Sequence, residues 1–363
     1  MKRHALALCV TLLLVSCGAR LTDEQSGAGT SGRADVRPVA PSIAYVMVGA
    51  GSTTTDDRPA YLRLPGAAPA QLGAGMLLAA AGDDRLLLLR FDGHIQAFRA
   101  GAQPVLLHDR AAQGERPNGV VVGDVLYELR SSGIVATDAS GAMRNIALPA
   151  ARPTDDVKFC EIRKGLFDPR ASAGRAIAGA NGHLYAFVST YVNGAIVDLF
   201  DGRRLDLPES GPAIAMTSGS DGKLYALTVD QRCNTNTPVV RRIDPVTMRE
   251  EAAIDTHRPL GFDGIDLVGG RGGATYVHAV TATSAELLRV DATAVTAMPL
   301  PADSGLLAAA APDGAIYLFG GRARNVVTRF DPATNAVAQV DEARGPDGSF
   351  IQAVLFLDSP HRP

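Results

Sequence analysis

The chain is 363 residues long and contains no tryptophan, four cysteines and only 5% aromatic residues. Lysine occurs at four positions, and arginine supplies the rest of the 35 basic residues. The formal net charge of −3 gives no general attraction to nucleic acid, so we expect no nucleic-acid partner. No pair or cluster of histidines and cysteines has metal-ligand spacing, and neither a Gly-x-Ser-x-Gly elbow nor a phosphate-binding loop occurs. We therefore expect no metal and no cofactor.

The N-terminus has the pattern of an export signal. Positive residues at Lys2 and Arg3 precede an apolar segment at 5–15, which is too short for a mature membrane-spanning helix. The segment ends in Leu-Val-Ser-Cys-Gly at 14–18, which resembles the lipobox of bacterial lipoproteins. That resemblance implies cleavage after residue 16 and a lipid on Cys17. The alternative is an ordinary secretory peptide with a chance cysteine.

The predicted organisation has four parts: a lipoprotein signal peptide at 1–16, a flexible tether at 17–41, a folded domain at 42–358 and a tail at 359–363. The tether assignment depends on its Gly, Ser, Ala and Asp content without hydrophobic periodicity. We expect export and anchoring through Cys17. In many bacterial lipoproteins an aspartate after the lipidated cysteine retains the protein in the inner membrane, and this chain has Gly18 there. In a cell with an outer membrane we therefore expect anchoring in that membrane, on its periplasmic side or its surface. In a cell without one we expect the outer face of the plasma membrane.

The domain is built from a repeated unit of four short strands. Its clearest copy spans 213–254, with a tight turn at Asp221-Gly222 and a second turn at Asp244-Pro245. A tyrosine recurs on the second strand and an aspartate in the turn between the third and fourth strands, at a base period of about 40 residues. The tyrosines are Tyr127, Tyr185, Tyr225, Tyr276 and Tyr317, and the aspartates are Asp138, Asp201, Asp244, Asp291 and Asp331. We expect the tyrosines to pack in the core.

Six units account for residues 76–341, and the two ends of the domain complete another. An apolar strand at 351–357 has no unit of its own, and the strands at 43–48 and 61–64 lack a first strand. Pairing these ends predicts an all-β fold, a β-propeller of seven blades with four antiparallel strands each. Six or eight blades are the fallback, and two open β-sandwiches are the other fold considered.

The units resemble those of bacterial propellers of the Kelch, NHL and YVTN types. The most Kelch-like stretch runs from Ile316-Tyr317-Leu318-Phe319-Gly320-Gly321 to Asn335, although it lacks the tryptophan that usually follows. The resemblance implies an architecture more than a function, because such propellers serve many unrelated roles.

The predicted functional face carries the loops from strand two to three and from strand four to the next blade. The connection at 149–175 is far longer than its equivalents and contains Cys160, while Cys233 lies in a loop of the same face. After signal removal and lipidation these are the two remaining thiols, so we predict a disulfide between them in an oxidising envelope. Two free cysteines are the alternative. Polar candidates for ligand binding on this face are Arg116, Asn118, Asp168, His257, Arg258, Asp263, Arg322 and Arg324.

These features favour a binding or scaffold protein over an enzyme. The predicted protein is a monomeric propeller, anchored to the membrane through Cys17, that presents its loop face to a protein, peptide or glycan partner. The alternative is a hydrolase or lyase resembling gluconolactonases or streptogramin lyases, acting on a small polar substrate at the channel mouth, with Asn118, His257 and Asp263 as contributors. A quinone-dependent dehydrogenase is disfavoured because tryptophan is absent.

Overall fold

A computed structural model describes most of the domain as strands joined by turns. The described residues are 43–48, 58–75, 77–81, 84–112, 118–151, 172–208, 210–229, 237–257, 264–269, 274–280, 285–298, 300, 305, 307–320, 323–342 and 349–357. The chain divides into two units, Met1–Val39 and Ala40–Pro363, and all described residues belong to the second. Those residues include no helix that is long and apolar enough to cross a membrane.

The described strands form seven antiparallel sheets of four strands each. We number six of them as blades 1–6 in chain order and name the remaining sheet the closing blade. Blade 1 contains β4 (Leu77–Ala80), β5 (Arg85–Leu89), β6 (His94–Arg99) and β7 (Val105–Ala111). Blade 2 contains β8 (Gly119–Val122), β9 (Val125–Leu129), β10 (Ile134–Thr137) and β11 (Met143–Ile146). Blade 3 contains β12 (Ser172–Ala180), β13 (His183–Thr190), β14 (Gly194–Asp198) and β15 (Arg204–Leu207).

The other blades repeat this arrangement. Blade 4 contains β16 (Ala213–Ser218), β17 (Leu224–Val229), β18 (Pro238–Asp244) and β19 (Arg249–Asp255). Blade 5 contains β20 (Gly264–Val268), β21 (Thr275–Val280), β22 (Ala285–Val290) and β23 (Val295–Met298). Blade 6 contains β24 (Leu307–Ala310), β25 (Ile316–Gly320), β26 (Ala323–Asp331) and β27 (Ala336–Glu342). The closing blade orders β28 (Phe350–Phe356), β1 (Ile43–Val48), β2 (Pro59–Arg63) and β3 (Ala70–Ala74) from the inside outward.

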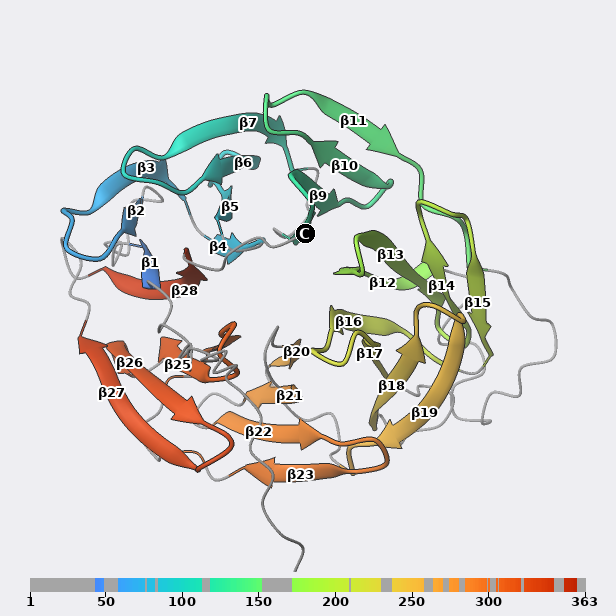
Figure 1. Cartoon of the computed structure of the whole chain (residues 1–363). Coiled ribbons are helices and arrows are strands. Elements are labelled where there is room, and N and C mark those ends of the chain that lie inside the picture. The colour runs from blue at the N-terminus through green and yellow to red at the C-terminus, as the bar shows by residue number, and fades with distance from the viewer. Residues whose placement is uncertain are drawn as a thin grey trace, which may run out of the picture. The chain divides into compact units, whose positions relative to one another are not determined.

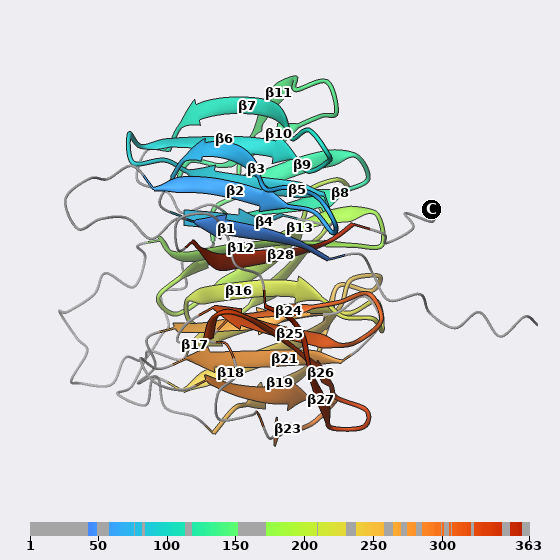
Figure 2. The same cartoon turned by 90° about the vertical axis from the view of Figure 1, so that its left-hand side faces the viewer.

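Within this unit the blades stand around a common axis (Figure 1), and the prediction of an all-β propeller is confirmed. The first strand of each blade lies innermost and the fourth outermost, as the outer positions of β7, β11, β19 and β27 show (Figure 1). Seen from the side, the strands run roughly along the axis of the ring (Figure 2). Inner strands of neighbouring blades contact each other, including β12 with β16, β16 with β20 and β24 with β28. These inner strands enclose the space that we call the channel.

The hydrophobic core lies between the blades as separate clusters, one at each junction of the described ring. Alternate residues of a second strand face opposite neighbours: Leu184 packs with blade 2, whereas Tyr185 packs with blade 4. The same division places Tyr276 against blade 6 and Val277 against blade 4. All five repeat tyrosines are at most 7% exposed, so their predicted packing role is confirmed. Each such side chain contributes about 1.5–3 kcal/mol by leaving water.

The ring is closed by pairing β1 with β28. Ile43 pairs with Phe356 and Val48 with Phe350, and a bulge interrupts the register between Val46 and Met47. The predicted pairing of the two ends of the domain is therefore confirmed. Side chains of both strands pack against blade 1 in one cluster, and those of β28 pack against blade 6 in another.

The turns show why the repeated aspartates are present. Asp138 Oδ1 accepts hydrogen bonds from the backbone N–H groups of Ser140 (2.8 Å) and Ala142 (3.1 Å). In blade 3, Asp201 lies in the turn between the third and fourth strands, as predicted, but another carboxylate accepts the turn N–H groups. Asp198, three residues earlier, accepts from the N–H groups of Phe200 (3.0 Å) and Asp201 (3.3 Å).

Removal of β28 tests the closure. Deletion of residues 349–363 leaves one edge of β1 unpaired and removes apolar side chains from the two junctions beside it. We expect aggregation and loss of the cooperative thermal transition, measured by calorimetry and size-exclusion chromatography. Deletion of residues 359–363 alone is the control and should leave the transition unchanged. A 349–363 deletion that melts like the parent protein would contradict closure as the source of stability.

Candidate functional site

Two loop-face candidates from the sequence lie within the described residues. Asn118 is exposed directly before β8, at the junction of blades 1 and 2. His257 follows β19, at the junction of blades 4 and 5, and its side chain is 81% exposed. Both lie in connections between a fourth strand and the next first strand, as predicted. No described contact joins them, and they belong to different junctions.

The other predicted site residues lie outside the described residues: Cys17, Arg116, Cys160, Asp168, Cys233, Arg258, Asp263 and Arg322. Arg324 is in β26, but its side chain is not described. The lipidation, the disulfide and the binding roles of these residues stay predictions.

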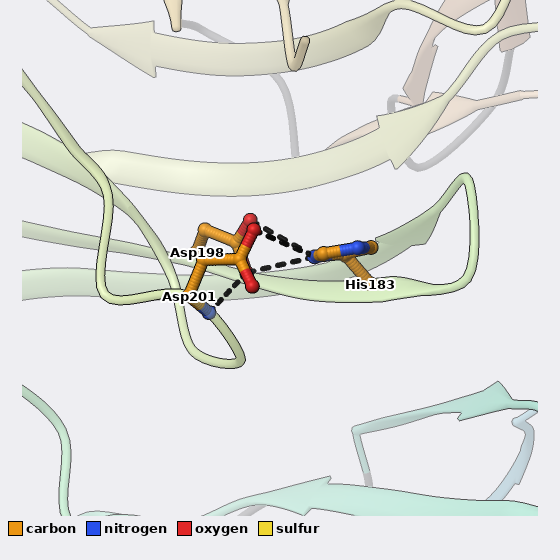
Figure 3. A group of neighbouring side chains, drawn as sticks. All are labelled: His183, Asp198 and Asp201. Atoms are coloured by element: carbon orange, nitrogen blue, oxygen red, sulfur yellow. Dashed lines mark hydrogen bonds and ion pairs between the residues drawn. The ribbon is translucent and has the colours of Figure 1, made fainter.

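A histidine and two aspartates gather at the turns of blade 3 (Figure 3). His183, Asp198 and Asp201 each offer a ligand atom, and these atoms lie within 4.8 Å of one another. The Nδ1 atom of His183 is 3.0 Å from Asp198 Oδ2 and 3.8 Å from Asp201 Oδ2. The arrangement is close enough for a divalent cation, so its other contacts decide what it does.

Those contacts already satisfy the central carboxylate. Asp198 is fully buried, and its Oδ2 atom accepts a hydrogen bond from Arg203 Nη2 at 2.7 Å. Burial acts to raise the pKa of Asp198, but hydrogen bonds from Arg203, from the Phe200 N–H group and from His183 outweigh it and lower the pKa. A metal ion would have to compete with the Arg203 cation. We therefore assign the cluster to stabilising the turns of blade 3.

Turn aspartates of two other blades also bond an arginine, although at different positions of the blade. In blade 4, Arg242 Nη2 and Tyr225 Oη both donate to Asp221 Oδ2, at 3.0 and 2.9 Å. In blade 6, Arg329 Nη2 donates to Asp313 Oδ2 at 3.1 Å. In these two blades the arginine lies on the third strand and the aspartate in the turn between the first and second strands.

A second buried ionisable group joins blades 1 and 2. Glu128 of β9 accepts hydrogen bonds from His108 Nε2 and, at 3.1 Å, from Arg110 Nη2, both on β7. The side chains of His108 and Glu128 are 2% and 1% exposed. Because this pair is enclosed and internally bonded, it offers nothing to a ligand.

A cavity of about 890 Å³ opens along the channel and differs from these clusters. Its wall comes mainly from the inner strands β4, β16, β20, β24 and β28, with contributions from β21 and β25. Small and apolar side chains dominate it, among them Ala80, Val268, Leu307 and Phe319. A volume of this size matches small-molecule sites, which span roughly 300–1,000 Å³.

Two ionisable side chains interrupt this apolar wall. Asp266 of β20 and His278 of β21 are direct partners in the antiparallel register, so both project from the same face of blade 5. Asp266 is accessible from the channel but enclosed by surrounding strands, and this burial raises its pKa despite a hydrogen bond from the Leu267 N–H group. His278 is 5% exposed, and its Nε2 atom has no hydrogen-bond partner among the residues that the structure describes. Burial lowers the pKa of His278 to about 4, so its imidazole is neutral near pH 7.

Loop-based reasoning missed this pair, although the sequence contained a signal. First strands elsewhere read as small apolar runs, such as Ala-Ile-Ala-Met at 213–216, whereas β20 has an aspartate within Ile-Asp-Leu-Val. A carboxylate in the innermost strand of a propeller faces either a core or the channel. Pairing it with His278 required the register, which sequence alone does not supply.

Comparisons with known proteins support the fold and no more. No protein-family model and no curated protein sequence matches the chain. Among solved structures, apo AztD from Citrobacter koseri is similar with a TM-score of 0.52 and 11% identity, over 87% of this chain and 98% of that one. A second structure of Citrobacter koseri AztD has a TM-score of 0.51 and 11% identity over the same shares. BamB from Moraxella catarrhalis is 12% identical over 81% of this chain and 92% of its own, with a TM-score of 0.45. At such identities the likeness shows the propeller fold alone.

Substitution of Asp198 tests the structural role of the blade 3 cluster. Asp198→Asn should lower the free energy of unfolding at pH 7 by about 3 kcal/mol, because it breaks a buried ion pair. The folded pKa of Asp198 is lowered, so its contribution is present above the ordinary value of 3.8 and is lost as pH falls through the folded value. The difference between parent and variant in urea denaturation should therefore shrink in acid.

Asp201→Asn is the matched control, because Asp201 is 49% exposed and belongs to the same cluster. It should change the free energy of unfolding by no more than about 1 kcal/mol. A chelator should leave the parent protein unchanged. Marked destabilisation by the chelator would instead show that the cluster holds a metal.

Proposed function

We propose that this chain is an exported, lipid-anchored binding protein whose propeller receives its ligand from the loop face into the channel. The channel cavity is the observation that carries this proposal. It combines a volume suited to a ligand with a buried, unpartnered His278 Nε2 atom and a carboxylate that lacks a described cationic partner. Buried polar groups without partners are rare in folded proteins and point to an absent partner.

The contrast with the other described ionisable clusters supports this choice. Asp198, Asp221 and Glu128 are each bonded to an arginine of the chain itself. Within the described residues, Asp266 accepts a hydrogen bond from the adjacent backbone N–H group of Leu267 and forms no ion pair. Asp266 and His278 differ from these clusters because they line the channel cavity and no described arginine bonds to them.

A binding role is better supported than hydrolysis. An activated nucleophile needs a base in hydrogen-bond contact, and no hydrogen bond joins Asp266 to His278 in the described structure. The lipoprotein anchor and the Kelch-, NHL- or YVTN-like character of the repeats remain part of the proposal. They are supported by the lipobox-like segment and by the repeated units.

Photo-crosslinking from the cavity tests the binding role. A benzophenone amino acid replacing Leu307, which lines the cavity and is 41% exposed, should give a defined adduct in the native envelope. The same residue replacing Val246, 69% exposed in the turn between β18 and β19, is the control. Mass spectrometry should find the adduct at 307 and not at 246. Equal labelling at both positions, or none at 307, would argue against the proposed site.

Substitution of Cys17 tests the anchor. Cys17→Ser should prevent lipid attachment, so the protein should move from the membrane fraction to the soluble envelope fraction. Intact-mass analysis of the parent protein should show a Cys17 N-terminus with two or three acyl chains. Ser16→Ala, which keeps the cysteine, should remain membrane-bound. An unmodified mature parent protein would contradict the anchor.

The disulfide between Cys160 and Cys233 is tested by non-reducing peptide mapping. In the exported protein we expect one crosslinked peptide pair that disappears on reduction, because the other two cysteines are removed or lipidated. Cys160→Ser should leave Cys233 reactive toward a thiol reagent. Reactivity of both thiols in the untreated parent protein would rule the bridge out.

A further inference from the structure

We propose that the channel of this protein binds a small organic cation, an amine or ammonium group on an apolar body, with Asp266 and His278 holding the cationic end. The proposal rests on the proposed binding function and adds the chemical class of the ligand. It starts from the charge of the cavity. Among the described residues that line it, Asp266 is acidic and none is arginine or lysine.

The position of Asp266 makes a positive ligand favourable. Asp266 is exposed to the channel and surrounded by the inner strands, and no arginine, lysine or histidine of the described residues acts on its charge. Enclosure penalises the ionised form, which is why the pKa of Asp266 is raised. A cation in the channel would relieve that penalty, whereas an anion would increase it.

His278 supplies the second contact. Cross-strand partners have Cβ atoms about 5 Å apart, so one ligand head group can reach both side chains. A neutral imidazole has one acceptor nitrogen, which can take an N–H from an ammonium group. Because His278 stays neutral near pH 7, it does not repel a cation.

The remaining wall selects the body of the ligand. Leu77, Ile265, Val280 and Phe319 line the cavity together with a run of alanines at 308–310. Burying apolar surface against them contributes about 25 cal/mol per Å². The described wall thus favours a molecule with one charged end and an apolar remainder over a glycan, whose many hydroxyl groups would lack partners there.

A series of probes with one tail and three head groups tests this inference. n-Octylamine, n-octanol and octanoate have comparable apolar tails but carry charges of +1, 0 and −1 at pH 7. Isothermal titration calorimetry with the parent protein should show n-octylamine binding at least about tenfold more tightly than octanoate, with n-octanol between them. Because this comparison uses the unmodified protein, it does not depend on the folding of any variant.

Two variants locate the site. Asp266→Asn should abolish the preference, so that n-octylamine and octanoate bind with about equal affinity. His278→Phe should weaken n-octylamine binding and leave n-octanol binding nearly unchanged. Asp124→Asn, an exposed carboxylate in the turn between β8 and β9, is the matched control and should retain the full preference. The thermal transition of each variant should match that of the parent protein.

Three results would overturn the inference: equal binding of all three probes, tighter binding of octanoate, or an unchanged preference in Asp266→Asn. Absence of binding by every probe would overturn it as well. The crosslinking from position 307 tests the proposed function separately. A crosslinked ligand that is not an organic cation would support the binding role but contradict the proposed ligand class.

Discussion

The antiparallel pairing of β1 with β28 is the interaction on which the rest of the domain depends. Each blade of a propeller is a small twisted sheet that cannot bury both of its faces alone, so it needs a neighbour on either side. In a ring every blade has two neighbours, but only when the last blade meets the first. Here one blade is assembled from both ends of the domain, so the ring closes only when the first and last strands of the chain pair with each other. The cores on either side of the closing blade both use residues of β28 or β1.

Closure has a consequence for function, because it creates the channel. The inner strands of a closed ring face a shared space that no single blade forms, and the cavity of about 890 Å³ draws on five of them. A polar residue on an inner strand is then neither in a core nor on an ordinary surface. Asp266 shows this intermediate state: it is reachable by water, but strands enclose it and raise its pKa.

The described ionisable groups fall into two kinds according to their partners. The turn clusters of blades 3, 4 and 6 and the Glu128 cluster are bonded within the chain, and breaking such buried pairs costs several kcal/mol. Within the described part of the chain, His278 Nε2 has no hydrogen-bond partner and Asp266 has no cationic partner. The first kind stabilises the ring, and the second leaves interaction capacity in the channel. This division, more than the presence of histidines and carboxylates, separates the structural groups from those that we propose bind a ligand.

Much of the architecture followed from the amino-acid pattern. Turn residues such as Asn181 and Gly182, with φ of 51° and 76°, and the regular placement of tyrosines and aspartates specify four-stranded units, because turn chemistry and strand alternation are local. The unpaired strands at the two ends predicted the closure for the same reason. Residue type alone did not identify the aspartate that accepts the turn N–H groups in blade 3, which is Asp198 rather than Asp201, because the two aspartates are three residues apart. The pairing of Asp266 with His278 and the enclosure that perturbs both could be decided only by the tertiary structure, since cross-strand register and burial depend on residues from several blades.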